Sequence, residues 1–223
     1  MTRFTVTPDE MIERHLKARD ISDARVLAAM RAVPREQFVG PSWAASAYED
    51  HALPIGAGQT ISQPYIVALM VQALALGECD HILDVGTGSG YAAAVMAQIA
   101  GDVVSLEREA ALAADAAERL AQLGYTNVAV QVADGWKGWP DAAPYDAIHV
   151  AAAAPAVPES LKQQLATGGR LIIPVKHSSG HQWLKLITRT GADSYTTETL
   201  GGVRFVPLVE GTEVGQCDQH DRR

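Results

Sequence analysis

Three glycines at a spacing of two residues follow a short apolar run, and they are the clearest chemical signal in this sequence. Residues 81–85 favour a buried parallel strand, and Gly86, Gly88 and Gly90 come directly after it. Glycines at the carboxyl end of such a strand let the backbone turn sharply and approach a ligand closely. Residues 91–100 then favour a helix whose first amides would face that ligand. The stretch predicts a nucleotide-type cofactor site, although a plain tight turn between a strand and a helix would contain the same glycines.

The spacing of the glycines distinguishes between cofactors. A dinucleotide fingerprint has the pattern Gly-x-Gly-x-x-Gly, in which the third glycine allows close packing over a pyrophosphate. Here Tyr91 occupies the position of that third glycine. The pattern therefore favours S-adenosylmethionine (SAM), which has no pyrophosphate, over a nicotinamide dinucleotide.

Two acidic residues end the next two predicted strands. Glu107 closes the strand predicted over residues 102–107, about 20 residues beyond the glycine turn, where an acid that accepts hydrogen bonds from ribose hydroxyls is expected. Asp134 follows the strand predicted over residues 127–133. Because the carboxyl ends of parallel strands meet at one edge of a sheet, we expect Asp134 to reach an adenine amino group. A solvated surface acid is the alternative interpretation of Glu107.

A polar stretch stiffened by proline precedes the glycine turn. Residues 52–65 contain two prolines, two glycines and a group of hydroxyl and amide side chains. Ordering such a loop costs conformational entropy, so we expect a positioned binding loop. Residues 63–76 favour a helix that Ser62 caps.

The elements that would position these residues alternate between strands and helices. Helices are expected over residues 110–124 and 158–166, and further strands over residues 144–150, 170–175, 182–189 and 203–208. This order predicts an α/β fold, a doubly wound Rossmann-like sheet that is mostly parallel, with antiparallel strands toward the carboxyl terminus.

The amino-terminal part of the chain is expected to be a helical extension of the same domain. Helices are predicted over residues 8–19 and 22–32, the second opened by Ser22. We expect one domain over residues 1–211, of which residues 1–50 form the extension. Residues 212–223 are expected to form a polar tail.

Composition excludes several classes of function. The chain has 223 residues and a formal charge of −8, with no basic stripe, so nucleic acid is a poor candidate for a substrate. No run approaches the roughly 20 apolar residues of a membrane helix, and the start lacks an apolar signal core, so we expect a cytoplasmic protein. Cys79 and Cys217 are far apart, and His177 and His181 lie in a predicted loop, which argues against a disulfide framework or a metal site.

Several blocks resemble the protein-L-isoaspartate (D-aspartate) O-methyltransferase family over roughly residues 26–211. The most specific block is Gly-Gln-Thr-Ile-Ser-Gln-Pro at residues 58–64, and the glycine turn is shared with SAM methyltransferases at large. The blocks that carry the resemblance are residues 32–38, 53–65, 83–91, 134–140 and 203–208.

The resemblance implies a site residue by residue. Ser62 matches the family's active-site serine, which flanks both the cofactor and the isoaspartyl group. The positions implied to bind SAM are Gln59, Thr60, Ile61, Asp84, Gly86, Thr87, Gly88, Ser89, Gly90, Glu107, Arg108, Asp134 and Gly135. Val203, Arg204 and Phe205 are implied, together with Ser62, to hold the substrate peptide in an extended form.

The implied reaction moves the SAM methyl group to the free α-carboxylate of an isoaspartyl residue, or to the side-chain carboxylate of a D-aspartyl residue, in a damaged protein. A carboxylate with a pKa near 4 is already ionised at neutral pH, so no general base is needed. Donors such as the Ser62 hydroxyl would orient the anion, and positioning would supply the catalysis. The partners would be isoaspartyl peptides and proteins, and we expect a monomer.

Two alternatives stay open at this point. The family often has threonine at Ala151, an aliphatic residue at His149 and glycine at Ala133. These departures would permit a related SAM methyltransferase that acts on another acceptor. A non-catalytic SAM-binding protein with the same fold is the second alternative.

Overall fold

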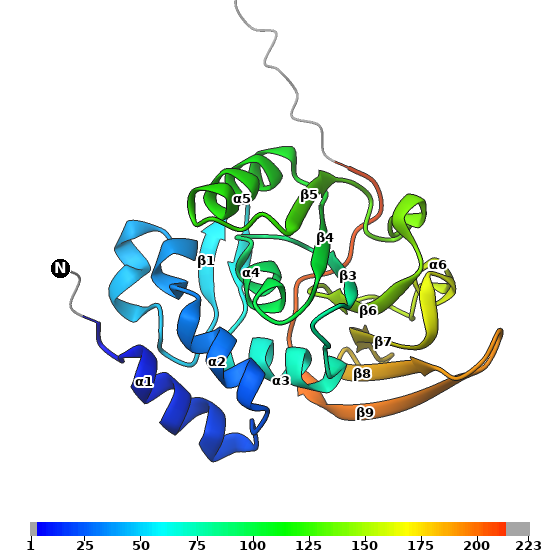
Figure 1. Ribbon diagram of the computed structural model, residues 1–223, viewed down its shortest axis with the longest axis horizontal. Coiled ribbons are helices and arrows are strands. Elements are labelled where there is room, and N and C mark those ends of the chain that lie inside the picture. Colours follow the sequence, from blue (N-terminus) through cyan, green and yellow to red (C-terminus); the bar gives the residue numbers. More distant parts are fainter. Residues whose placement is uncertain (1–3, 213–223) are drawn as a thin grey trace, which may run out of the picture.

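A seven-stranded sheet runs through the centre of the protein, as a computed structural model that describes residues 4–212 shows (Figure 1). The strand order is β5-β4-β3-β6-β7-β8-β9. The first five strands in this order are parallel, and β8 and β9 pair antiparallel. The strands are β3 (His81–Val85), β4 (Asp102–Glu107), β5 (Val128–Val132), β6 (Tyr145–Val150), β7 (Leu165–Lys176), β8 (Gln182–Arg189) and β9 (Tyr195–Val203). The predicted α/β architecture is confirmed.

Helices cover both faces of the sheet. The helices that alternate with the strands are α3 (Pro64–Leu74), α4 (Tyr91–Ala97), α5 (Ala110–Gln122) and α6 (Glu159–Gln163), and a short helix, η5 (Pro140–Ala142), precedes β6. Side chains of α3 and α4 pack in one core with Ile82 and Ala147 of the sheet. On the opposite face, Leu161 of α6 packs with Leu83 and Ile148. Successive residues of the central strands therefore face two different cores, as expected for a sheet that is buried on both sides.

The amino-terminal extension is helical but irregular. It consists of α1 (Pro8–Glu10), the π-helical turn η1 (Met11–Leu16), the 3-10 turn η2 (Lys17–Arg19), α2 (Ala24–Ala32), and the 3-10 turns η3 (Arg35–Phe38) and η4 (Pro41–Ser46). Asp23 caps α2 through a bond from the Arg25 amide, so the predicted start at Ser22 is wrong. An aspartate directly before the first helical residue places its carboxylate on the free amides.

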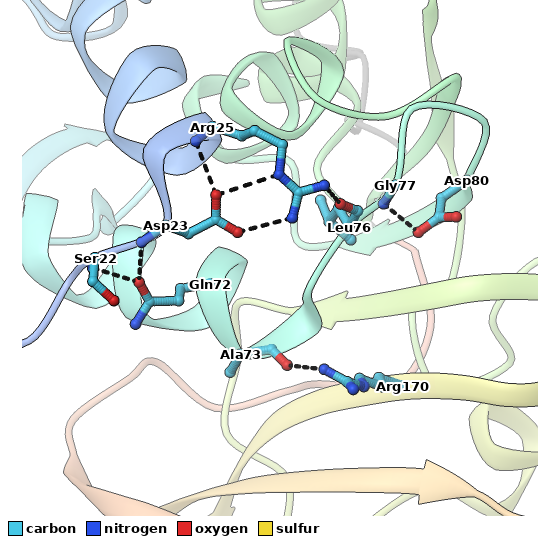
Figure 2. A network of polar contacts seen from close by, with 9 residues as sticks. All are labelled: Ser22, Asp23, Arg25, Gln72, Ala73, Leu76, Gly77, Asp80 and Arg170. Atoms are coloured by element: carbon cyan, nitrogen blue, oxygen red, sulfur yellow. Dashed lines mark hydrogen bonds and ion pairs between the residues drawn. The ribbon is translucent and has the colours of Figure 1, made fainter.

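Polar contacts attach the extension to α3 and its carboxyl end, and attach α3 to the sheet (Figure 2). The Gln72 side-chain oxygen accepts hydrogen bonds from the amides of Ser22 and Asp23, at 2.8 and 2.9 Å. Arg25 donates to the carbonyl of Leu76 at 2.6 Å, just beyond the end of α3. Arg170 of β7 donates to the carbonyl of Ala73 at 3.2 Å. Helix α3 is thus held between the extension and the sheet.

The stretch predicted as a binding loop forms a small antiparallel hairpin. Strands β1 (Leu53–Gly56) and β2 (Gln59–Ile61) pair outside the large sheet. Leu53 and Ile61, opposite each other at its base, are both buried. The chain reverses through Gly56, Ala57 and Gly58, which all have positive φ angles. The sequence predicted a loop here because of these glycines, and the same glycines allow the chain to reverse between the two strands.

Helix α3 is not capped by Ser62, contrary to the prediction. Gln63 is the N-cap, because the residue before Pro64 is held in an extended conformation. The Tyr65 amide is bound instead by the Asp50 carboxylate at 3.1 Å, which comes from the extension. The Ser62 hydroxyl is therefore not used in the cap.

The last predicted strand is also displaced. Strand β9 ends at Val203, whereas residues 203–208 were expected to form a strand. Beyond Val203 the chain leaves β8 and crosses to the end of β6, where Pro207 makes an isolated bridge with Ala153. Apolar residues of this segment line two cavities at the sheet edge. Their alternation along the sequence is therefore the same as in a strand, although the segment is not one.

One buried cation joins the extension to the hairpin and to α4. Arg35 is fully buried, and it donates to the carbonyl oxygens of Ala47 at 2.7 Å and Ser62 at 2.8 Å. Its guanidinium lies over the Tyr91 ring, 4.7 Å from the ring centroid. Burial lowers the pKa of Arg35 from its ordinary value, an effect that Tyr91 opposes. The Arg35 side chain therefore fixes the relative positions of three segments that are distant in sequence, namely the end of the extension, the end of the hairpin and the start of α4.

The start of β7 contains an irregular bulge of several residues that requires glycine. Leu165 pairs with Tyr145, yet the next paired residues are Arg170 and Ala147. The additional residues of β7 fold tightly against β6. A Cβ atom on Gly169 would lie 2.9 Å from the carbonyl oxygen of Ala166 and 3.0 Å from those of Tyr145 and Asp146. All of these atoms belong to the backbone and cannot move aside easily.

We expect Gly169→Ala to lower the free energy of unfolding by about 2–3 kcal/mol, because the new methyl group overlaps three carbonyl oxygens. Gly202→Ala is the matched control in β9, where a Cβ meets nothing within 4 Å, and it should change the free energy by about 1 kcal/mol or less. Urea unfolding followed by circular dichroism measures both. Equal midpoints for the two variants would contradict the packing described for the bulge.

We expect Arg35→Lys to lower the free energy of unfolding by about 2–4 kcal/mol, because an ammonium cannot bridge the two carbonyls and stack on Tyr91 at once. Arg31→Lys is the control, since Arg31 and its partner Asp9 are 51% and 77% exposed. That change should cost about 0.5 kcal/mol or less. The same urea experiment distinguishes them, and an Arg35→Lys protein as stable as wild type would refute the bridging role.

Candidate active site

The glycine turn lies at the carboxyl edge of the sheet, between β3 and α4. Gly86, Gly88 and Gly90 all adopt positive φ angles, of 94°, 52° and 89°. The amides of Gly86 and Thr87 donate to the carbonyl of Leu106 on β4, at 2.8 and 3.0 Å. The turn is thus fixed to the neighbouring strand by backbone bonds, in a conformation that glycine adopts without strain.

Glu107 folds across this turn from the end of β4. Its Oε2 atom accepts a hydrogen bond from the Gly88 amide at 2.9 Å. Its Oε1 atom accepts from the amides of Arg108 and Glu109, at 2.8 and 3.1 Å. The residue is only 7% exposed, yet it lines a cavity together with residues of the turn. Its carboxylate is fixed in place by the backbone, and its predicted bond to a ribose stays a prediction.

That cavity brings together most of the residues expected to bind a cofactor. Segments from the hairpin, the glycine turn and the ends of β4, β5 and β6 all contribute to its wall. The expected residues that line it are Gln59, Thr60, Ile61, Ser62, Gly86, Thr87, Gly88, Ser89, Glu107, Arg108 and Gly135.

Three other expected cofactor residues do not line the cavity. Asp84 lies fully buried beneath the turn, and Gly90 is the N-cap of α4. The Oδ1 atom of Asp134 accepts a hydrogen bond from the Trp136 amide at 3.0 Å, which shapes the turn after β5. Leu208 lines the cavity near this turn, and the Trp136 indole donates to the Leu208 carbonyl at 3.2 Å. Any contact of Asp134 with adenine stays a prediction.

A second groove opens beside the cavity. The expected substrate residues Val203, Arg204 and Phe205 line it, together with Ile66 and Leu69 of α3 and the half-exposed Trp183 of β8. Thr60, Ser62, Ala151 and Val206 line both the cavity and the groove. The two therefore meet at Ser62, whose carbonyl oxygen is held by Arg35.

The structure also contains a histidine–aspartate pair that the sequence did not reveal. His149 of β6 is 2% exposed, and its Nδ1 atom lies 2.7 Å from Oδ1 of Asp84. The two residues are register partners on adjacent parallel strands. Only this register brings them together, because they are 65 positions apart in sequence. His149 lines the cavity and not the groove.

Within residues 4–212, no group of three or more His, Cys, Asp or Glu side chains is arranged to hold a metal ion. His177 and His181 are exposed beside Ser179 in the turn between β7 and β8. No helix of the same residues is long and apolar enough to cross a bilayer. Cys79 is exposed and unpaired, whereas Cys217 and the predicted tail beyond Thr212 lie outside the described residues.

Solved structures of known proteins share this fold. One of them is titled protein-L-isoaspartate O-methyltransferase and has a TM-score of 0.82 and 30% sequence identity. The match covers 90% of this chain and 65% of the chain in that structure. A putative protein-L-isoaspartate O-methyltransferase from Plasmodium falciparum, solved with S-adenosyl-L-homocysteine, has a TM-score of 0.76 and 29% identity. That match covers 89% of this chain and 96% of the other.

Sequence comparisons identify the family. The family model described as protein-L-isoaspartate(D-aspartate) O-methyltransferase matches residues 7–213. Protein-L-isoaspartate O-methyltransferase 2 of Marinobacter nauticus is 58% identical over 199 residues, which cover 89% of this chain and 91% of the relative. Protein-L-isoaspartate O-methyltransferase of Rhodopseudomonas palustris is 57% identical, with the same coverage of both chains. The chain therefore belongs to the protein-L-isoaspartate(D-aspartate) O-methyltransferase family.

Proposed function

We propose that this protein transfers the methyl group of SAM to the free α-carboxylate of L-isoaspartyl residues in damaged proteins, and that the free β-carboxylate of D-aspartyl residues is a second acceptor. Family membership supports the reaction. The observation that carries the proposal is the meeting of cavity and groove at Ser62. A donor held in the cavity and an acceptor held in the groove would approach each other there.

In this proposal SAM occupies the cavity and supplies an activated methyl group on its sulfonium. The glycine turn would face the methionyl and ribose parts, and Glu107 would accept hydrogen bonds from the ribose hydroxyls. Gly135 and Leu208 line the part of the wall where an adenine ring would lie. These roles are proposed from the position of each residue in the wall.

The residues around Ser62 suit an acceptor that needs orientation and no deprotonation. A carboxylate is ionised at neutral pH, so the nucleophile is present without a general base. The hydroxyls of Ser62 and Thr60 can donate hydrogen bonds that direct one carboxylate oxygen toward the methyl carbon. His149 could act as a base, but it faces only the cavity. This favours a carboxylate acceptor over the hydroxyl acceptor of a related methyltransferase.

The groove would hold the peptide on either side of the isoaspartyl residue. Val203, Arg204 and Phe205 line it, and the Phe205 amide and carbonyl are both bound by Gln182, at 2.6 and 3.0 Å. The Gln182 side chain thereby fixes the backbone of this edge. We propose that the peptide lies along it in an extended form.

We further propose that residues 1–211 form one domain. This domain would act as a monomer in the cytoplasm, without nucleic-acid or membrane partners. The net charge of −8 supports the absence of nucleic-acid binding.

The reaction is tested by methyl transfer from labelled SAM to a short isoaspartyl peptide. The same peptide with normal aspartate is the matched control, and a D-aspartyl version is the third substrate. We expect labelling of the isoaspartyl peptide and none of the control, and the D-aspartyl peptide shows whether its β-carboxylate is also an acceptor. Binding of SAM without transfer to any of them would contradict the proposed reaction and favour another acceptor or a non-catalytic role.

We expect Ser62→Ala to lower turnover roughly tenfold to a hundredfold, because one hydrogen bond to the anionic acceptor is lost. The affinity for S-adenosylhomocysteine should change by about threefold or less. Ser62→Thr keeps a hydroxyl and should retain more turnover than Ser62→Ala. Ser42→Ala, on the exposed turn η4, is the control. Unchanged turnover in Ser62→Ala would contradict the proposal that the Ser62 hydroxyl orients the acceptor carboxylate.

A further inference from the structure

A row of polar side chains crosses three central strands inside the apolar core. His149 of β6, Asp84 of β3 and Ser105 of β4 are register partners, and they are 2%, 0% and 0% exposed. The Asp84 carboxylate bonds His149 at 2.7 Å through Oδ1 and Ser105 at 2.6 Å through Oδ2. The Ser105 hydroxyl lies 2.6 Å from that of Thr87 in the glycine turn. The row thus extends from β6 to the turn.

The positions of the protons follow from this order. Ser105 donates its single hydroxyl proton to the Asp84 carboxylate, so Thr87 donates to Ser105. The carboxylate can only accept, so the bond from His149 places a proton on Nδ1. In the neutral tautomer with this proton, the Nε2 atom carries a lone pair and is a hydrogen-bond acceptor. It is buried, and no group among residues 4–212 bonds to it.

The surroundings of Nε2 indicate what it would bind. His149 lines the cavity, and apolar residues such as Val67 and Met70 of α3 are also part of the cavity lining. Among the described side chains, no lysine or arginine forms an ion pair with Asp84, and its only basic neighbour within 4 Å is the His149 ring. A buried carboxylate without a nearby lysine or arginine favours a cationic ligand, and an unpaired buried acceptor favours a ligand with a proton to donate.

The methionyl end of SAM offers both properties in one group. Its α-ammonium is a cation with three protons, whereas its sulfonium has no proton to donate. The adenine amino group is a donor but carries no charge. The α-ammonium is therefore the part of the ligand that matches the surroundings of Nε2.

We propose that Nε2 of His149 accepts a hydrogen bond from the α-ammonium of SAM, with Asp84 fixing the ring and balancing the charge. The inference rests on the proposed function, because it assumes that SAM occupies the cavity. His149 is in this sense a positioning residue, which sets the methionyl arm and with it the direction of the sulfonium methyl group. The Thr87 hydroxyl connects the same row to the turn that faces the rest of the ligand.

Binding measurements on His149→Leu test this contact by isothermal titration with two ligands. The first is S-adenosylhomocysteine, and the second is its analogue with hydrogen in place of the amino group. We expect the dissociation constant of S-adenosylhomocysteine to rise about tenfold to a hundredfold, because a hydrogen bond to a charged group is lost. The deaminated analogue should bind both proteins with the same affinity within about twofold.

Two further variants separate the contact from a general effect on packing. His149→Gln places an acceptor oxygen near the position of Nε2 and should recover part of the lost affinity. Ile148→Leu changes the neighbouring residue of β6, which faces the opposite core, and should leave both affinities unchanged. Thermal unfolding of each variant verifies that it is folded. If His149→Leu does not fold, the two affinities are compared between wild type and His149→Gln.

The outcomes are distinguishable from a failure of the proposed function. Equal losses for both ligands, or no loss for S-adenosylhomocysteine, would overturn the contact while SAM binding stands. Wild-type protein that binds neither ligand would overturn the proposed cofactor and the contact together. Selective loss of the amino-bearing ligand would support the contact even if the acceptor proved to be something other than an isoaspartyl carboxylate.

Discussion

The buried guanidinium of Arg35 is the constraint on which the arrangement of the site depends. It binds the Ala47 and Ser62 carbonyls and stacks on Tyr91, so both the hairpin side and the α4 side of the cavity are fixed to one group. A cation removed from water is stable only when its partners stay in place. Moving Ser62 would leave the buried Arg35 guanidinium without one of its partners, so the free-energy cost of burying Arg35 favours a single position of Ser62.

A second constraint acts from below the glycine turn. The Asp84 carboxylate and its partners hold Thr87, while the Glu107 carboxylate holds Gly88 from above. Two acidic groups thus shape a turn whose ligand carries a positive sulfonium and an α-ammonium in our proposal. The local electrostatics and the local geometry favour the same ligand, although the two carboxylates reach the turn from different strands.

The parts of the fold that depend on local sequence could be predicted. The central strands have continuous aliphatic runs, and the glycines after β3 have a spacing that only a sharp turn explains. The features that were missed depend on contacts between distant residues. Asp50 caps α3 in place of Ser62, and the parallel register alone brings His149 to Asp84.

Other errors arose where one pattern fits two structures. The glycines of the β1–β2 hairpin are typical of a loop, and they form the reversal between two strands. The alternation of residue types over residues 203–208 is typical of a strand, but these residues line two cavities instead. Tyr91 was informative in the sequence only as the residue that replaces a glycine. Its ring turns out to be the surface on which Arg35 stacks.

We propose that donor and acceptor meet at Ser62, and a crystal structure with S-adenosylhomocysteine and an isoaspartyl peptide tests this arrangement most directly. We expect the isoaspartyl α-carboxylate within hydrogen-bonding distance of the Ser62 hydroxyl, with one oxygen facing the cofactor sulfur and the peptide extended along residues 203–206. A peptide bound elsewhere, or a carboxylate directed away from the sulfur, would contradict it.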